Sequence, residues 1–197
     1  MTDVLARVLD ATDATFGGGS ASALAGAMAA GLVGMVARLS LGRGLALDDA
    51  RYDVYAVEAD TLGRALHAGA EQDAEAYGLV KAAYGLPRDG LAQAAARQTA
   101  IHDALIAAAL VPLDNARRSL RVRELCRELD GRSNAAAASD LGVAVALADA
   151  AVGGCLLNVE VNLDALPASS AAARLRHAAE AARIRHACIC APPKERT

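Results

Sequence analysis

The sequence predicts an all-α fold, in which a single-domain bundle of long helices dimerises. Hydrophobic residues make up 54% of the 197-residue chain, yet aromatic residues make up only 3%, with no Trp and one Phe. Alanine dominates the apolar content, and it has the highest helix propensity at no cost in side-chain entropy. A sheet would instead need β-branched and aromatic residues. No linker divides the chain, so we predict one helical domain over residues 1–190 and a disordered tail over residues 191–197.

The periodicity of apolar residues places two helices in the first forty residues. Residues 2–12 predict a short amphipathic helix. The loop Phe16–Ser20 (FGGGS) ends it and starts a second helix that runs to about Ser40, with Ser20 as the expected N-cap. Small residues recur at four-residue spacing on one face of this second helix: Ser22, Gly26, Ala30 and Gly34. Such a face allows another backbone to approach closely, which favours helix packing within the chain. Because one chain cannot supply enough backbone for all such faces, we also expect a second copy of the chain to contact them.

Four more helices are expected, over residues 47–84, 91–130, 134–166 and about 170–188. The connections between them contain helix breakers, at residues 41–45, 86–90 and 131–134. Pro112 is expected to bend or break its helix near Leu110. Ser169 or Ser170 is the expected N-cap of the last helix.

The charge and the N-terminal sequence indicate the class of partner and the compartment. A net charge of −3 and a pI near 5.8 are unlike those of a nucleic-acid-binding protein, which carries a basic face and stacking aromatic residues. Residues 1–9 hold charged residues and no apolar run, so no secretory signal peptide is expected. We therefore predict a cytoplasmic protein with four reduced cysteines. Cys188 and Cys190 have no second ligand pair in the sequence, and we predict no metal site.

Two apolar stretches are long enough to raise the question of a membrane span. Residues 21–37 carry no charge but consist mainly of Ala, Gly and Ser, whose transfer into a bilayer is only weakly favourable. Residues 134–159 contain Asp140 and Asp149. Both stretches are predicted to be buried helices of a soluble protein, without a membrane partner.

Glycines 17–19 and Ser20 form the first of three candidate sites. Glycines let the backbone approach a ligand closely, and the free N–H groups and dipole of a helix N-terminus attract an anion or a carbonyl oxygen. A short glycine run is also typical of a flexible connection.

Asp73 and Tyr77 form the second candidate site, because residues four apart share a helix face. One turn earlier on that face lie Gly69 and Ala70, whose small size leaves room beside the carboxylate. A partly desolvated carboxyl group has a raised pKa, which suits proton transfer. The simpler alternative is that Asp73 is one of several exposed acids on a charged helix.

Asp140, Asn158 and Asn162 form the third candidate site, on one long and otherwise apolar helix. The two asparagines are one turn apart, and buried amides need hydrogen-bond partners. Asp140 lies five turns from Asn158, about 27 Å along an unbroken helix, so the two cannot hold one small group. Hydrogen bonding between helices is the alternative role for both asparagines.

Four segments together resemble the cyclodeaminase/cyclohydrolase family, which comprises the C-terminal half of formiminotransferase-cyclodeaminase and stand-alone bacterial relatives, including methenyltetrahydrofolate cyclohydrolase. The segments are GGGSASALAGAMAAGLVGMVARLSLGR, DAEAYGLVKAAYGLPR, AALVPLDNA and NAAAASDLGVAVALADAAVGGCLLNVEVNL, in the order and at the spacing of the family. The resemblance extends from about Val4 to Leu166. The family usually has a proline just before the glycines, where this chain has Phe16.

The resemblance implies an all-α homodimer, or an assembly of dimers, that binds a reduced folate and needs no metal and no redox cofactor. Asp73 matches the acidic residue of the family's DxxAF/Y motif, which implies that it transfers protons. The resemblance implies that the following residues surround the substrate: Gly17, Gly18, Gly19, Ser20, Tyr77, Asp140, Asn158 and Asn162.

Two reactions belong to this family, and both need one group that moves protons. The expected reaction is the hydrolysis of 5,10-methenyltetrahydrofolate to 10-formyltetrahydrofolate, which the stand-alone length favours. The alternative is the cyclodeaminase reaction, which releases ammonia from formiminotetrahydrofolate, and a further alternative is a non-catalytic helical scaffold or folate carrier. The glutamate tail of a folate would need cations, for which Arg38, Arg43 and Arg88 are candidates, although each is equally typical of a solvated surface.

Overall fold

The computed structural model describes residues 4–191, and within this range all regular structure is helical, so the all-α prediction is confirmed. The helices are α1 (Val4–Leu9), α2 (Gly18–Ser40), α3 (Asp49–Tyr84), α4 (Leu91–Leu129), α5 (Ala138–Asp164) and α6 (Ser170–Cys190). A 3₁₀ turn, η1 (Ala135–Ala137), precedes α5. The predicted tail lies outside the described residues, except for Ala191, which follows α6.

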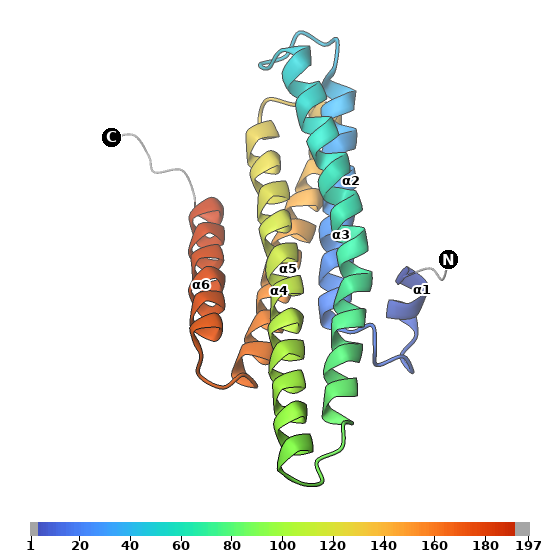
Figure 1. Ribbon diagram of the computed structural model, residues 1–197. Coiled ribbons are helices and arrows are strands. Elements are labelled where there is room, and N and C mark those ends of the chain that lie inside the picture. Colours follow the sequence, from blue (N-terminus) through green and yellow to red (C-terminus); the bar gives the residue numbers. More distant parts are fainter. Residues whose placement is uncertain (1–3, 192–197) are drawn as a thin grey trace.

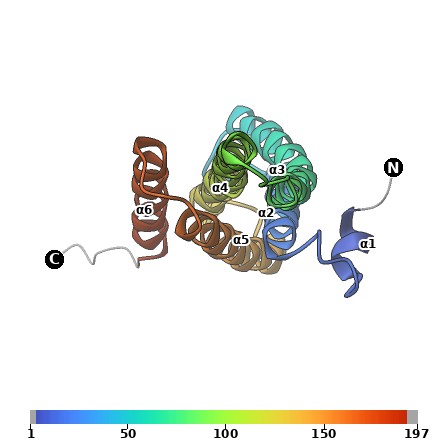
Figure 2. The same cartoon turned by 60° about the horizontal axis from the view of Figure 1, so that its bottom comes forward.

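Helices α2 to α5 form a bundle in which consecutive helices run in opposite directions (Figure 1). Short connections favour this arrangement, because they keep consecutive helices adjacent. Helix α6 packs against α4 and α5 on the outside of the bundle, and α1 lies on the opposite side against α2 (Figure 2).

The helix termini agree with most of the predicted ones, and Ser20 is the exception among the predicted caps. Ser169 caps α6 as predicted, and its hydroxyl oxygen accepts a hydrogen bond from the Ala172 amide at 3.1 Å. Ser20 is not an N-cap, because α2 begins at Gly18 with Gly17 as the capping residue. Pro112 does not break α4, which continues through it. Helix α4 packs against α2, α3, α5 and α6, and this packing offsets the one hydrogen bond that a proline removes.

The predicted small-residue face of α2 is covered within the chain. A Cβ atom added to Gly26 would lie 2.6 Å from the Ser119 hydroxyl of α4. Ser22 fills the corresponding space beside Gly154 of α5, and Ala30 faces Gly63 of α3. The predicted helix packing of this face is therefore confirmed: it allows α3, α4 and α5 to surround α2 closely.

Two helical segments, Gly18–Ser40 and Ala135–Asp164, are long and apolar enough to span a bilayer by length and composition, with mean hydropathies of 1.6 and 1.8. Both pack in the bundle, and α2 contacts all three other long helices. Each segment contains an apolar stretch of 18 residues, of which the bundle buries 56% in the first segment and only 39% in the second. Helix α5 therefore keeps a larger uncovered apolar face than α2.

Candidate functional site

The carboxylate of Asp73, on α3, lies against the first turn of α2. A Cβ atom added to Gly19 would lie 2.6 Å from the carboxylate carbon, so only glycine allows this approach. The backbone amide of Ser20 donates to the carboxylate. Asp73 thus accepts a hydrogen bond from one of the free N–H groups at the start of α2. It does the work of an N-cap side chain, a role that was predicted for Ser20.

Ser20 is fully buried behind Asp73 and does not line the cavity described below. Its hydroxyl donates to the Ala70 carbonyl oxygen at 2.9 Å and lies 3.3 Å from Oδ2 of Asp73. A hydroxyl group has one hydrogen, so the two acceptors share it. Ser20 therefore fixes the position of Asp73 relative to α2.

Burial raises the pKa of the Asp73 carboxyl group above its usual value of 3.8. The hydrogen bonds from the side chain and the backbone of Ser20 act in the opposite direction and reduce the rise in pKa. The net pKa is raised because removing a carboxylate from water disfavours its charged form. The raised pKa brings Asp73 closer to the range in which a carboxyl group transfers protons at neutral pH.

A cavity of about 400 Å³ opens beside Asp73, between the loop before α2 and helices α3, α4 and α5. Seven predicted site residues line it: Gly17, Gly18, Gly19, Asp73, Tyr77, Asn158 and Asn162. The prediction that Asp73 shares a cleft with the glycine loop is therefore confirmed.

The two asparagines enter the cavity wall from α5. Nδ2 of Asn158 donates to the Gly154 carbonyl oxygen at 2.9 Å and would lie 3.5 Å from a Cβ atom added to Gly18. Nδ2 of Asn162 donates at 2.9 Å to the carbonyl oxygens of Asn158 and Ala108. The expected bonding between helices thus occurs at Asn162, which joins α5 to α4.

Sequence reasoning missed the apolar and aromatic wall residues Val80, Tyr84, Leu105, Ala108 and Val161, and also Ala14, Thr15 and Ala165. A signal for two of them was present. Asp73, Tyr77, Val80 and Tyr84 follow one another at intervals of four, three and four residues, which places them on one face of α3. Leu105 and Ala108 of α4 could not be found in this way, because their place in the wall depends on how α4 packs against α3 and α5.

Asp140 does not line this cavity. It lies in the first turn of α5, five turns from Asn158 and about 27 Å away along the helix. Arg38 is also far from the cavity, because it lies near the other end of α2, about 30 Å along the helix from its first residue. Arg43 follows that end of α2. Arg38 pairs with Asp60.

Phe16, which stands where the resembled family has proline, does not line the cavity. Phe16 packs against the buried cluster that contains Val4 of α1, and the Arg7 guanidinium carbon lies 4.1 Å from the ring centroid. Phe16 therefore anchors α1 to the loop, and Gly17 still follows it into the cavity wall.

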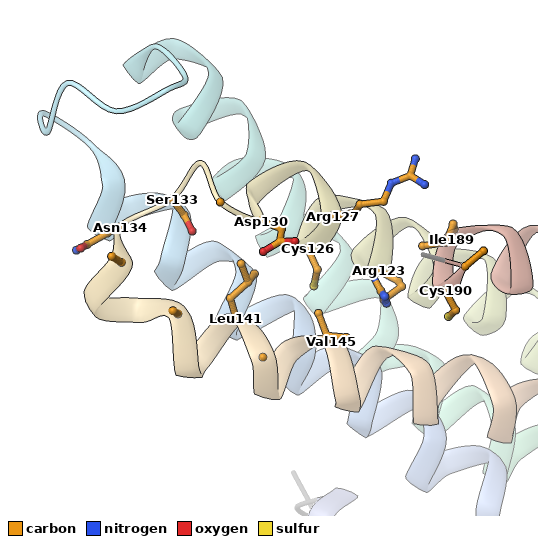
Figure 3. Close-up of a pocket in the computed structure, with 15 residues that line it drawn as sticks. Arg123, Cys126, Arg127, Asp130, Ser133, Asn134, Leu141, Val145, Ile189 and Cys190 are labelled. Carbon is orange, nitrogen blue, oxygen red and sulfur yellow. The ribbon is translucent and has the colours of Figure 1, made fainter. Parts of the chain in front are cut away.

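A larger cavity, of about 630 Å³, lies where the last turns of α4 and α6 meet the start of α5, and Figure 3 shows Arg123, Cys126 and Cys190 among its lining residues. Next to it, one ligand atom each of Asp149, His186 and Cys190 lie within 4.8 Å of one another. Oδ1 of Asp149 accepts a hydrogen bond from Nε of Arg123 at 2.9 Å. The Asp149 carboxylate therefore already has a cationic partner.

The four cysteines are free and fall into two classes. Cys188 and Cys190 are exposed at the end of α6. Cys126 and Cys155 are buried, and burial raises the pKa of each thiol to about 12. Such thiols stay protonated and act as core residues, because only the thiolate is an effective nucleophile or metal ligand.

The matches between this chain and known proteins include the following three. A family model described as formiminotransferase-cyclodeaminase matches residues 1–181. A methenyltetrahydrofolate cyclohydrolase from Methylorubrum extorquens is 37% identical over 153 residues, which cover 77% of this chain and 74% of that protein. The crystal structure of formiminotetrahydrofolate cyclodeaminase from Thermotoga maritima matches with a TM-score of 0.78 at 24% identity, covering 89% of this chain and 84% of that chain. At that identity the third match shows a shared fold.

Proposed function

This chain belongs to the formiminotransferase-cyclodeaminase family, and we propose that it is a folate one-carbon enzyme that hydrolyses 5,10-methenyltetrahydrofolate to 10-formyltetrahydrofolate. The similarity to a protein named for this reaction, at 37% identity over most of both chains, supports the choice of substrate. The proposal rests on one geometric feature: the Asp73 carboxylate lies against the Gly19 backbone in the wall of a cavity of about 400 Å³.

The reaction begins with a methenyl carbon that bridges two nitrogens and carries a positive charge. The Asp73 carboxylate stabilises this amidinium electrostatically and accepts a proton from the water molecule that adds to the carbon. The addition gives a tetrahedral carbon bearing a hydroxyl group. Asp73 then returns a proton to N5 as the bond between the carbon and N5 breaks. The hydroxyl group loses its remaining proton to solvent as it becomes the C=O of the formyl group, which stays on N10.

Each of these steps depends on a proton carrier fixed in position. Ser20 holds the carboxylate through its hydroxyl and backbone amide. The raised pKa of Asp73 makes it a stronger base than a solvated aspartate, and a better match to proton transfer near neutral pH. None of the steps requires a metal or a redox cofactor.

The rest of the cavity supplies contacts for the pterin. The hydrogen bonds of Asn158 and Asn162 use the NH₂ groups of their side chains, so the amide oxygens are the atoms available to accept from pterin N–H groups. Tyr77 provides an aromatic face, and glycines 17–19 let the ring approach the backbone of the loop.

The cyclodeaminase reaction is the alternative that this family offers. There, the formimino nitrogen is protonated and N10 attacks the formimino carbon. N10 loses its proton, and the formimino nitrogen takes up a second proton and leaves as ammonia. Asp73 suits that proton transfer as well, so the geometry of one carboxylate fits both reactions. A protein that binds folate without turnover would be a carrier.

A paired assay of the purified protein separates the three functions. We expect the absorbance of methenyltetrahydrofolate to fall faster with the protein than without it, at a pH where spontaneous hydrolysis is slow. We expect no ammonia release from formiminotetrahydrofolate. Ammonia release without hydrolysis would assign the cyclodeaminase reaction, and binding of both compounds without either product would assign a carrier.

A further inference from the structure

Arg97, in the second turn of α4, lies beside the wall of the Asp73 cavity. Its Nη2 donates a hydrogen bond to the carbonyl oxygen of Tyr84, the last residue of α3, at 3.1 Å. Its guanidinium carbon lies 5.7 Å from the centroid of the Tyr84 ring. Since Tyr84 lines the cavity, Arg97 brings a positive charge next to the cavity end formed by the end of α3.

The Arg97 guanidinium is held by Tyr84 yet keeps donors without a partner. Its Nε is unpaired but buried, whereas its Nη1 makes no hydrogen bond and is not buried, so Nη1 is the donor that a ligand can reach. Arg97 takes part in none of the ion pairs found between residues 4 and 191. Arg121, on the same helix, instead pairs with Glu58 and Glu128. A guanidinium presents its donors in a planar fork that matches a carboxylate, so Arg97 is suited to an anionic ligand.

The distance from Asp73 to Tyr84 fits the length of a folate. The two residues are eleven positions apart on one face of α3, about 16 Å along the helix. In a reduced folate, the benzoyl group and an amide bond separate the one-carbon unit from the glutamate carboxylates by about 10 Å, the length of three extended residues. The long side chain of Arg97 spans the remaining gap.

We propose that Arg97, held over Tyr84, binds a carboxylate of the glutamate on the folate substrate; this rests on the proposed function of the Asp73 cavity. The one-carbon unit then lies at Asp73, and the benzoyl ring follows the wall formed by Tyr77 and Tyr84. Arg97 is a specificity residue in this arrangement, because it distinguishes a folate from a pterin without its glutamate.

Binding of two stable compounds tests this role: 5-formyltetrahydrofolate, and the methylamide of 5-formyltetrahydropteroate, which keeps the benzoyl amide bond but has no glutamate and no carboxylate. By titration calorimetry, we expect Arg97→Gln to weaken binding of the first compound about 10- to 100-fold and of the second less than about threefold, the size of one charge-assisted contact. Arg97→Lys keeps the charge but loses the fork, and should fall between. Arg117→Gln is the matched control, because Arg117 is exposed on the same helix and pairs with Asp114. It should bind both compounds as the wild type does.

Equal weakening for both compounds would overturn the proposal, because Arg97 would then only support the shape of the cavity. Unchanged binding of both, or wild-type protein that binds neither, would overturn it as well. A wild type that binds both compounds but hydrolyses no methenyltetrahydrofolate would contradict the proposed reaction alone. The glutamate-dependent loss in Arg97→Gln would still support the carboxylate contact. Circular dichroism of each variant checks that the helices remain folded.

Discussion

At the scale of single residues, Asp73 is more buried than the other acidic residues near it on α3, because α2 lies against it. Glu71 and Glu75, two positions away on α3, are exposed, whereas Asp73 is half-buried against α2. The difference arises at Gly19, whose missing side chain leaves space for the carboxylate. The same contact supplies the backbone amide of Ser20 as a donor. A carboxylate that is partly desolvated and also hydrogen-bonded combines a raised pKa with a fixed position.

Replacing Asp73 with Asn should abolish most turnover while leaving folate binding largely intact. The amide is nearly isosteric and can still accept from Ser20, but it neither takes a proton nor offsets a positive charge. Loss of a general acid or base costs about 10²–10⁴ in rate. We expect kcat to fall by that factor with a small change in KM, measured by steady-state kinetics on methenyltetrahydrofolate. A variant with wild-type kcat would show that another group moves the proton.

The same substitution should raise the thermal stability at neutral pH. Because the pKa of Asp73 is raised in the folded state, the folded protein binds its proton more tightly than the unfolded chain does. Stability therefore falls as the pH rises from 3.8 through the raised pKa, and ionised Asp73 remains destabilising above it. Asparagine has no charge to desolvate. We expect Asp73→Asn to have the higher Tm at about pH 7 and a smaller advantage at about pH 4. A difference in Tm that is the same at both pH values would contradict this.

Gly19→Ala should displace the Asp73 carboxylate without removing it. The added Cβ atom would lie 2.6 Å from the carboxylate carbon, so the carboxylate must move. Misplacement by about 1 Å can cost about 10²-fold in rate, and we expect a fall in kcat of that order. Gly31→Ala in the same helix is the control, because its Cβ atom meets nothing within 4 Å. It should keep full activity and gain up to about 1 kcal/mol in unfolding free energy. Wild-type kcat in Gly19→Ala would mean that the carboxylate position is not critical.

At the scale of elements, the close approach of α3 and α4 depends on a second glycine. Asn115 of α4 is fully buried, and its Nδ2 donates to the Gly69 carbonyl oxygen at 3.2 Å. Its side-chain oxygen accepts from Arg118 at 2.9 Å. A buried amide with both groups bonded fixes how far α4 is displaced along α3. This register in turn brings Leu105 and Ala108 of α4 to the cavity.

Gly69→Ala should destabilise the bundle at this contact. The added Cβ atom would lie 2.8 Å from the Asn115 side-chain carbon, and Asn115 has no exposed space to move into. Overpacking of this kind costs about 1–3 kcal/mol, which urea unfolding would measure. Gly78→Ala, on the same helix, is the control. Its Cβ atom meets nothing within 4 Å, and it should gain about 0.5–1 kcal/mol. Equal stability of the two variants would rule out a tight contact at Gly69.

At the scale of the whole molecule, the bundle leaves apolar surface uncovered. The bundle buries only 39% of the apolar 18-residue stretch in the segment Ala135–Asp164, which contains α5. Val143 and Leu157 on α5 are 52% and 63% exposed. On α2, which packs beside α5, Met28 is 52% exposed. Large exposed apolar side chains on two neighbouring helices are a feature of protein interfaces. We therefore propose a homodimer in which a second copy of the chain covers this surface of α2 and α5. The reason is the exposed apolar side chains, and the small-residue face of α2 is not part of the argument.

Multi-angle light scattering should show the wild type as a dimer at micromolar concentration. Met28→Glu combined with Val143→Glu places two charges on the apolar surface, and a buried unpaired charge is costly. We expect this double variant to be monomeric with an unchanged helical circular dichroism spectrum. A monomeric wild type would contradict the dimer, and a dimeric double variant would move the interface to another surface.

The sequence by itself determined the helices and most of their ends. Alanine content, the breakers between helices and the Ser169 cap act within a few residues, so they can be read locally. Asp73 and Tyr77 could also be placed on one face, because helical periodicity does not depend on tertiary contacts. The tertiary structure decided which polar groups meet. It buried Ser20 behind Asp73, left Asp140 at the far end of α5, and put Arg97 beside Tyr84. These outcomes depend on the register between helices, which is set by close contacts such as that of Gly19 with Asp73, between residues far apart in the sequence.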